Sequence, residues 1–164
     1  MGTTDMEGNP FLRGLTPEQH DLFSGLFVPI QLASGRTVFH QGDTATYMYV
    51  LLEGSVSILY KPYDGPRIML TALHVGDVFG WSSVVGNPTY TSEAVTRTAG
   101  RGLRAAGADI RRMCSLHPTA GSQVLRRLAL AVAPRWTDSQ QQVERLLQQG
   151  ILDGAEEPRA DAPI

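Results

Sequence analysis

The chain has 164 residues, enough for one domain with a substantial core. Hydrophobic residues make up 42% of it and the formal net charge is −2, so the composition predicts a folded protein without a general attraction to nucleic acid or to an anionic membrane. No segment reaches the roughly 20 apolar residues that span a bilayer. The N-terminal residues lack the pattern of a signal peptide, and the single cysteine, Cys114, cannot form an internal disulfide. These features predict a cytoplasmic protein that makes no membrane contact.

The N-terminal segment is predicted to contain a leader and one short helical unit. Residues 1–10 are polar and include glycine, which favours a flexible leader. Helical periodicity follows over residues 11–26. Thr16 is the expected N-cap of this unit, and Pro17 suits the first helical position. The predicted domain extends from this unit to residue 147.

The middle of the chain, about residues 28–106, has the rhythm of an all-β fold. Short apolar runs alternate with turn signals at intervals of about eight to twelve residues. Several glycines fall where the turns are expected to need a positive φ angle. These are Gly35, Gly42, Gly54, Gly65 and Gly76. The pattern predicts a mainly β fold with flanking helices, in which the strands form an antiparallel, jelly-roll-like β-roll.

Helical patterns return after the strands, over about residues 108–147. A helix over residues 108–116 is expected to end at His117-Pro118, because the residue before a proline disfavours helix. A second helix is expected over residues 119–147, with a kink or break at Pro134. The remaining residues, 148–164, are predicted to be a disordered acidic tail.

Enzyme signatures are missing from the sequence. The histidines His20, His40, His74 and His117 are far apart and form no metal-binding pair, and Cys114 has apolar neighbours typical of a structural cysteine. A β-roll could bring His40 and His74 together as in cupin metalloenzymes, but the closely spaced histidines of cupins are absent. The sequence therefore predicts no catalytic residue, no metal site and no cofactor.

One segment, residues 75–94, has the features of a small-ligand site. Gly80 precedes a stretch, Trp81–Val85, that could form one helical turn, and such an arrangement can direct backbone N–H groups at an anion. A loop with Pro88 and a hydroxyl-rich strand follow. The alternative is a packing turn anchored by Phe79 and Trp81.

The order of these motifs resembles the cyclic-nucleotide-binding domain shared by the catabolite activator protein and the regulatory subunits of protein kinase A. The resemblance extends over residues 11–147, and the bacterial single-domain branch with FGWS in place of FGE is the most similar. The segments that carry it are Phe11–Leu15, Gly35–Phe39, Gly42–Asp43, Tyr49–Val56 and Gly76–Gly80. It implies a β-roll followed by helices that hinge over a ligand pocket.

The sequence departs from this family at two charged positions. The resemblance implies a glutamate that binds the ribose hydroxyl, and this chain has Trp81 at that position. The resemblance also implies an arginine that pairs with the cyclic phosphate. This chain has Tyr90 there, or Thr89 if the loop alignment shifts by one residue. Loss of both contacts predicts weak or no binding of cAMP and cGMP. The candidate ligand-contact residues are Phe79, Gly80, Trp81, Ser82, Ser83, Thr89, Tyr90, Thr91 and Ser92.

The leading hypothesis is therefore a non-enzymatic regulatory or sensor module. One alternative is a receptor for a different nucleotide-like ligand, such as a cyclic dinucleotide. Another is a structural interaction domain in which Trp81 fills the former ribose space, and a cupin-like metalloenzyme is the least favoured.

The output of such a module is expected to pass through the C-terminal helices to an unidentified protein partner or to a second copy in a homodimer. Pro118 is the predicted hinge, and the apolar residues expected to form the output surface are Leu125, Leu128, Val132 and Trp136. The acidic segment after Leu147 is too short for a helix-turn-helix, so no direct DNA binding is expected.

Overall fold

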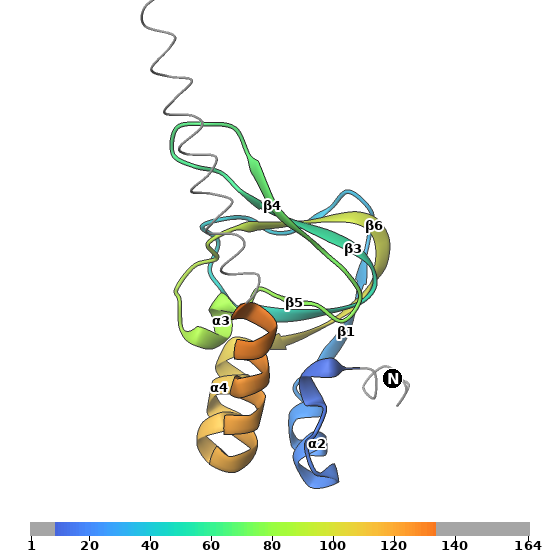
Figure 1. The fold of residues 1–164 in the computed structure, drawn as a ribbon, viewed down its shortest axis with the longest axis vertical. Helices are drawn as coiled ribbons and strands as arrows, with labels where there is room; N and C mark the ends of the chain where they lie inside the picture. The colour runs from blue at the N-terminus through green and yellow to red at the C-terminus, as the bar shows by residue number, and fades with distance from the viewer. Residues whose placement is uncertain (1–8, 134–164) are drawn as a thin grey trace, which may run out of the picture.

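A computed structural model describes residues 9–133 of the chain. Six antiparallel strands form one sheet that curls into a roll, and helices gather at one end of it (Figure 1). The strands are paired in the order β1-β6-β3-β4, with β2 also paired to β6 and β5 to β3. Their bounds are β1 Val28–Leu32, β2 Thr37–Phe39, β3 Tyr47–Tyr60, β4 Ile68–Leu73, β5 Val78–Phe79 and β6 Glu93–Ala106. The predicted antiparallel β-roll is confirmed.

Two strands of 14 residues each, β3 and β6, form the centre of the sheet. The sequence analysis placed a turn at Gly54, and this prediction was wrong, because β3 continues through Gly54. The φ angle of Gly54 is +91°, and the β3–β6 register shifts on both sides of it. A Cβ on Gly100 would overlap the carbonyl group of Glu53. These glycines therefore form a bulge in which two continuous strands bend, because a positive φ inside a strand gives a bulge as readily as a turn.

The turns that precede β3 and β5 share one motif, His-x-Gly-Asp. In each turn the aspartate carboxylate accepts a hydrogen bond from the backbone N–H of the histidine, at 2.9 Å for Asp43 to His40 and 2.9 Å for Asp77 to His74. The glycine between them has a positive φ angle in both turns. The predicted positive φ is confirmed at all five glycines, at values from +71° to +159°, although Gly54 lies within β3 rather than in a turn.

Strand β3 separates two hydrophobic cores, because its side chains alternate between the two faces of the sheet. Tyr49 and Leu51 face the interior of the roll, whereas Met48 and Val50 face the helices. We call these the roll core and the helix-side core. The buried members of the roll core are Leu32, Phe39, Tyr49, Leu51, Val56, Leu73, Phe79, Tyr90 and Ala94.

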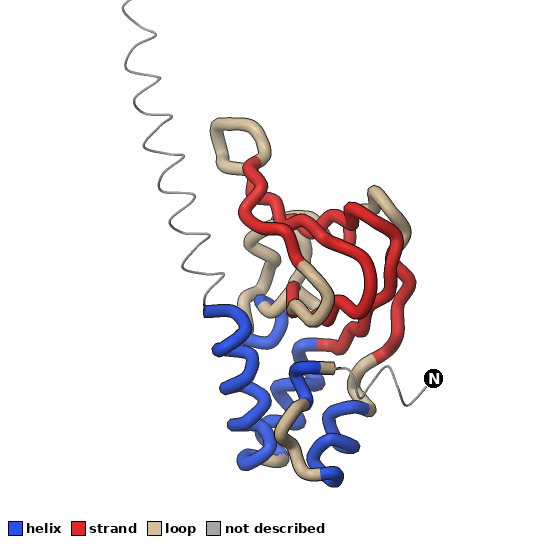
Figure 2. The backbone as a smooth tube through the Cα atoms, turned by 45° about the vertical axis from the view of Figure 1, so that its right-hand side comes forward, coloured by secondary structure: helices blue, strands red, loops and turns tan. Residues whose placement is uncertain are grey.

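The helices pack beneath the roll as a group (Figure 2). They are the 3-10 helix η1 Pro10–Leu12, α2 Pro17–Ser24, the single turn α3 Ser82–Val85 and α4 Gly107–Leu116, after which residues 118–133 are also helical. Thr16 caps α2 as predicted, in a capping box with Gln19. The break between α4 and the last helix falls at His117, the residue before Pro118, also as predicted. Pro134 and Trp136 lie outside the described residues.

The last helix contributes one face to the helix-side core. Leu128 is 4% exposed in this core together with Ala120 and Val124, whereas Leu125, three residues earlier on the same helix, is 43% exposed. The predicted output surface is thus divided in this arrangement: Leu125 is available at the surface, Leu128 belongs to the core, and Val132 is partly buried against it.

The two leucines provide a matched test of this packing. Leu128→Asp would bury an unpaired carboxylate and is expected to lower the free energy of unfolding by about 3–5 kcal/mol. Leu125→Asp, on the same helix, is expected to cost less than about 1 kcal/mol. Urea denaturation followed by circular dichroism measures both values, and equal losses would contradict the described helix orientation.

Candidate functional site

Aromatic side chains fill the interior of the roll beside the predicted ligand loop. The ring of Tyr90 stacks on Phe39 at 3.8 Å between ring centroids, and Tyr49 stacks on Phe79 at 5.0 Å. Phe39 joins the two pairs, at 5.9 Å from Tyr49 and 6.3 Å from Phe79. Each such pair contributes about 0.5–1.5 kcal/mol beyond the burial of its area. The four rings thus form a compact apolar wall inside the roll.

Tyr90 is fixed by its hydroxyl group as well as by its ring. The hydroxyl donates to the carbonyl oxygen of Tyr47 at 2.7 Å and accepts from the backbone N–H of Tyr47 at 3.0 Å. Burial raises the pKa of Tyr90, and burial raises the pKa of the neighbouring Tyr49 to about 12, so both phenols stay neutral at ordinary pH. At the position where the resemblance implies a phosphate-pairing arginine, the chain therefore has a neutral tyrosine whose hydroxyl already donates and accepts a hydrogen bond.

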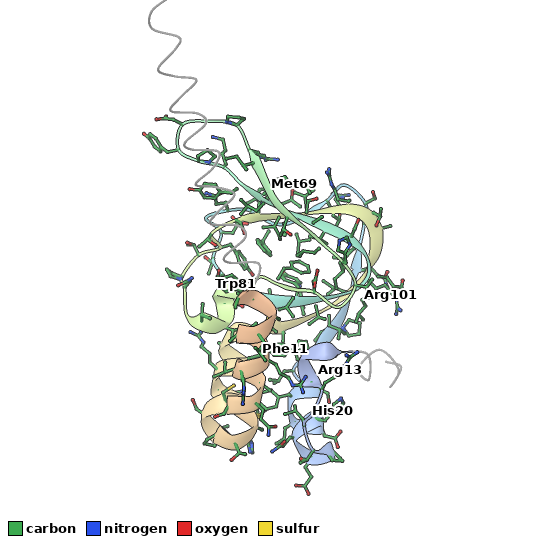
Figure 3. All side chains as sticks on the ribbon, viewed as in Figure 1. Phe11, Arg13, His20, Met69, Trp81 and Arg101 are labelled. Carbon is green, nitrogen blue, oxygen red and sulfur yellow. The ribbon has the colours of Figure 1, made fainter. Side chains whose placement is uncertain are left out.

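Trp81 lies outside this aromatic wall. Its partly buried side chain packs against the helix-side core, and it lies where α3 meets the helices (Figure 3). Gly80, with a φ angle of +71°, turns the chain immediately before it. This turn directs the side chains of Phe79 and Trp81 into different cores. Tyr90, and not Trp81, is the residue that lies in the roll core. That Trp81 fills the former ribose space stays a prediction.

The turn at Gly80 also positions α3 against both the roll and α4. A Cβ on Gly80 would lie 2.8 Å from the carbonyl oxygen of Tyr47, so only glycine fits there without a shift of the backbone. A Cβ on Gly107, the first residue of α4, would overlap the backbone and side chain of Ser83. The N–H of Gly107 donates to the carbonyl oxygen of Thr46 at 2.9 Å. The start of β3, α3 and the start of α4 are therefore in direct backbone contact.

The serines of α3 are buried in this contact. Ser82 and Ser83 are both buried, and the hydroxyl of Ser83 donates to the carbonyl oxygen of Gly80 at 2.9 Å. The backbone N–H of Ser83 donates to the same oxygen at 3.3 Å. Both donors that Ser83 would offer to an anion are thus used within the turn.

The loop after α3 joins the roll through Tyr90. The N–H of Tyr90 donates to the carbonyl oxygen of Asp43, and its own carbonyl oxygen accepts from the N–H of Gly42, both at 2.9 Å. Thr89 and Thr91 on either side are exposed, and Ser92 is half-buried. This alternation places Tyr90, rather than Thr89, on the inward face.

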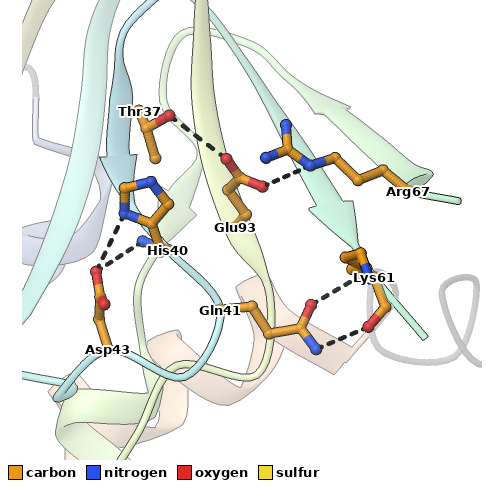
Figure 4. A network of polar contacts seen from close by, with 7 residues as sticks. All are labelled: Thr37, His40, Gln41, Asp43, Lys61, Arg67 and Glu93. Atoms are coloured by element: carbon orange, nitrogen blue, oxygen red, sulfur yellow. Dashed lines mark hydrogen bonds and ion pairs between the residues drawn. The ribbon is translucent and has the colours of Figure 1, made fainter. Parts of the chain in front are cut away.

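A polar network that the sequence did not indicate lies across β2, β6 and the β3–β4 hairpin (Figure 4). Glu93 is 6% exposed, and its carboxylate lies 3.3 Å from Nε of Arg67 and accepts from the Thr37 hydroxyl at 3.4 Å. Nearby, the side-chain amide of Gln41 exchanges two hydrogen bonds with the backbone of Lys61, at 2.8 and 3.1 Å. The network connects the hairpin to the sheet. The sequence feature that could have indicated it is Glu93, an acidic residue at the start of an apolar strand.

Two other chemistries find no site in the described part of the chain. Among residues 9–133, no group of three His, Cys, Asp or Glu side chains is arranged to hold a metal ion. Burial raises the pKa of the Cys114 thiol, which disfavours the reactive thiolate.

Within the same range, no helix is long and apolar enough to cross a membrane.

Fold and motif order define a class of ligand-binding regulatory domain, and comparison with known proteins gives its family. The family model for the cyclic nucleotide-binding domain matches residues 29–117. The chain belongs to the cyclic nucleotide-binding domain family. This family is regulatory and generally not enzymatic.

Several relatives illustrate this membership. The cyclic AMP receptor protein of Thermus thermophilus is 30% identical over 90 residues, which are 55% of this chain and 42% of that protein. A CRP-like cAMP-activated global transcriptional regulator of Mycobacterium tuberculosis is 28% identical over 117 residues, 71% of this chain and 52% of that protein. The chain thus spans about half the length of these curated relatives, or less. The solved structure of a cyclic nucleotide-binding domain from Methylobacillus flagellatus superposes with a TM-score of 0.75 at 14% identity, covering 89% of this chain and 84% of that one.

The hydroxyl of Tyr90 can be tested separately from its ring. Tyr90→Phe keeps the stacking but removes the hydroxyl from the partly buried backbone N–H and C=O of Tyr47, so the free energy of unfolding is expected to fall by about 1–3 kcal/mol. Tyr63, which is 98% exposed on the β3–β4 hairpin, gives the matched control, and Tyr63→Phe is expected to change nothing. Chemical denaturation of both variants makes the comparison. A Tyr90→Phe variant as stable as the wild type would argue against a structural role for the hydroxyl.

Proposed function

We propose that the chain is a regulatory domain of this family whose β-roll does not bind cAMP or cGMP tightly. The observation that carries the proposal is the buried Tyr90, 4% exposed, which occupies the interior where the family resemblance implies a phosphate-pairing arginine. A cyclic nucleotide would have to displace a ring that stacks on Phe39 and bonds the backbone of Tyr47. It would also gain no charge-assisted hydrogen bond from the residue at position 90 in return.

The position of Trp81 adds a second argument. The resemblance implies a carboxylate here for the ribose hydroxyl, and an indole packed against the helix-side core cannot accept a hydrogen bond. Together, the loss of two charge-assisted contacts of about 1.5–3 kcal/mol each corresponds to roughly a hundredfold or greater loss of affinity.

Calorimetry with cAMP and cGMP tests this proposal. Wild-type protein is expected to bind both no tighter than high micromolar, and the double variant Trp81→Glu, Tyr90→Arg is expected to bind cAMP more tightly. The control Trp81→Glu, Tyr90→Leu opens similar space without the positive charge and is expected to gain nothing. Low-micromolar binding of cAMP by the wild type would defeat the proposal.

The second part of the proposal is that the signal leaves through the C-terminal helices, toward a protein partner or a second copy of the chain. The close approach of Ser83 to Gly107 supports it, because α3 and the first residue of α4 lie in direct contact. Two leucines of residues 118–133, Leu125 and Leu130, are exposed and available for apolar contacts.

This output surface can be tested without unfolding the domain. Leu125→Asp is expected to abolish self-association or partner capture while the β-type circular dichroism spectrum stays unchanged. Analytical ultracentrifugation of wild type and variant measures the self-association directly. If the wild type self-associates and Leu125→Asp leaves this assembly intact, then Leu125 is not part of the output surface.

A further inference from the structure

Arg104 places a positive charge on the inner face of the roll. Its neighbours on β6, Leu103 and Ala105, are both buried in the helix-side core, so the alternation of side chains directs Arg104 to the opposite face. The strand register agrees. Arg104 lies opposite Tyr49 on β3 and Val28 on β1, and Tyr49 lies opposite Phe79 on β5. A row of inward-facing residues therefore crosses four strands, and Arg104 is its charged member.

The guanidinium of Arg104 contacts an aromatic ring rather than a carboxylate. Its central carbon lies 4.3 Å from the centroid of the Tyr47 ring. Two arginines of the sheet region, Arg67 and Arg101, pair with acids, Glu93 and Glu53 respectively. No acidic residue between positions 9 and 133 forms an ion pair with Arg104. Stacking on a ring uses the face of a guanidinium and leaves its N–H edge to point at an acceptor in the plane.

The row opens to solvent at the end where Arg104 lies. Val28, beyond Arg104, is 53% exposed, and Arg104 itself is half-buried. At the other end, Tyr49 and Phe79 are buried in the aromatic wall. The charge thus lies between the buried aromatic wall and the exposed end of the row.

We propose that Arg104 is an anion-binding residue of this roll and that its ligand is a small molecule with a phosphate ester group. A guanidinium with a free N–H edge matches the oxygen pair of a phosphate in a bidentate contact. The inference rests on the proposed function, because Tyr90 leaves the usual phosphate position without a charge. The positive charge that the resemblance implies at position 90 in the ligand loop is absent, and Arg104 on β6 carries a positive charge on the inner face instead.

Arginine side-chain NMR on the full chain tests the proposal directly. The Nε–Hε resonance of Arg104 is expected to shift on titration with inorganic phosphate and with adenosine 5′-monophosphate, and to stay in place with adenosine. Arg104→Gln is expected to weaken binding of the monophosphate by roughly tenfold to a hundredfold. Arg104→Lys keeps the charge but cannot make the bidentate contact of a guanidinium, so it is expected to weaken binding less.

Arg101 provides the matched control. It lies on the same strand, at the outside of the roll (Figure 3), and pairs with Glu53 at 2.6 Å, so Arg101→Gln removes the same charge without altering the inner face. This variant is expected to bind the monophosphate as the wild type does.

Two results would overturn the assignment. One is an Arg104 resonance that neither phosphate probe moves, a measurement that needs no variant to fold. The other is an equal loss of affinity in Arg104→Gln and Arg101→Gln. Failure of the proposed function is a separate result, namely tight cAMP binding by the wild type, and it can occur whether or not the Arg104 resonance responds.

Discussion

The pairing of β3 with β6 is the constraint on which the rest of the structure depends. Each strand has 14 residues, and the first half of β3 pairs with the last half of β6. Here one face of the pair lines the roll core and the other face contacts the helices. Such a strand cannot slip by one residue, because a slip would exchange the two sets of side chains. Tyr49 and Leu51 would then face the helices, and Met48 and Val50 would face the aromatic wall. The register therefore fixes both cores at once.

This register also decides what the interior of the roll can hold. With Tyr49 directed inward, Phe79 on β5 and Phe39 on β2 stack around it, and Tyr90 completes the wall. A residue at position 90 must then either join the apolar wall or disrupt it. A tyrosine joins it, since its hydroxyl finds two partners on the backbone of Tyr47. An arginine there would be compatible only with a ligand or counter-ion that neutralises it.

Much of this fold follows from the sequence, because glycines and the alternation of apolar residues have strong local signatures. Thr16, Pro17 and the His117-Pro118 break act within a few residues, and each was predictable. Gly54 was misinterpreted as a turn, since a glycine with positive φ occurs in both turns and bulges and only the long-range partner on β6 distinguishes them. The site was less predictable, because the direction of the Trp81 ring depends on the turn at Gly80, which is fixed by the approach of Tyr47 from a distant strand. Arg104 alternates with Leu103 and Ala105, a pattern that in most strands indicates a solvent-facing charge, and only closure of the sheet into a roll places it on an inner face.

The start of β3 is the point where these features meet. The carbonyl oxygen of Thr46 accepts from the first residue of α4, Gly107, while the backbone of Tyr47 holds the hydroxyl of Tyr90. The ring of Tyr47 lies under the guanidinium of Arg104. A ligand that draws on the Arg104 charge, or a substitution that removes the Tyr90 ring, therefore acts on residues one peptide bond away from the contact that positions α4. The chain thus retains a short physical connection between the roll interior and the C-terminal helices, although the charged groups that the family resemblance implies in the ligand loop are absent.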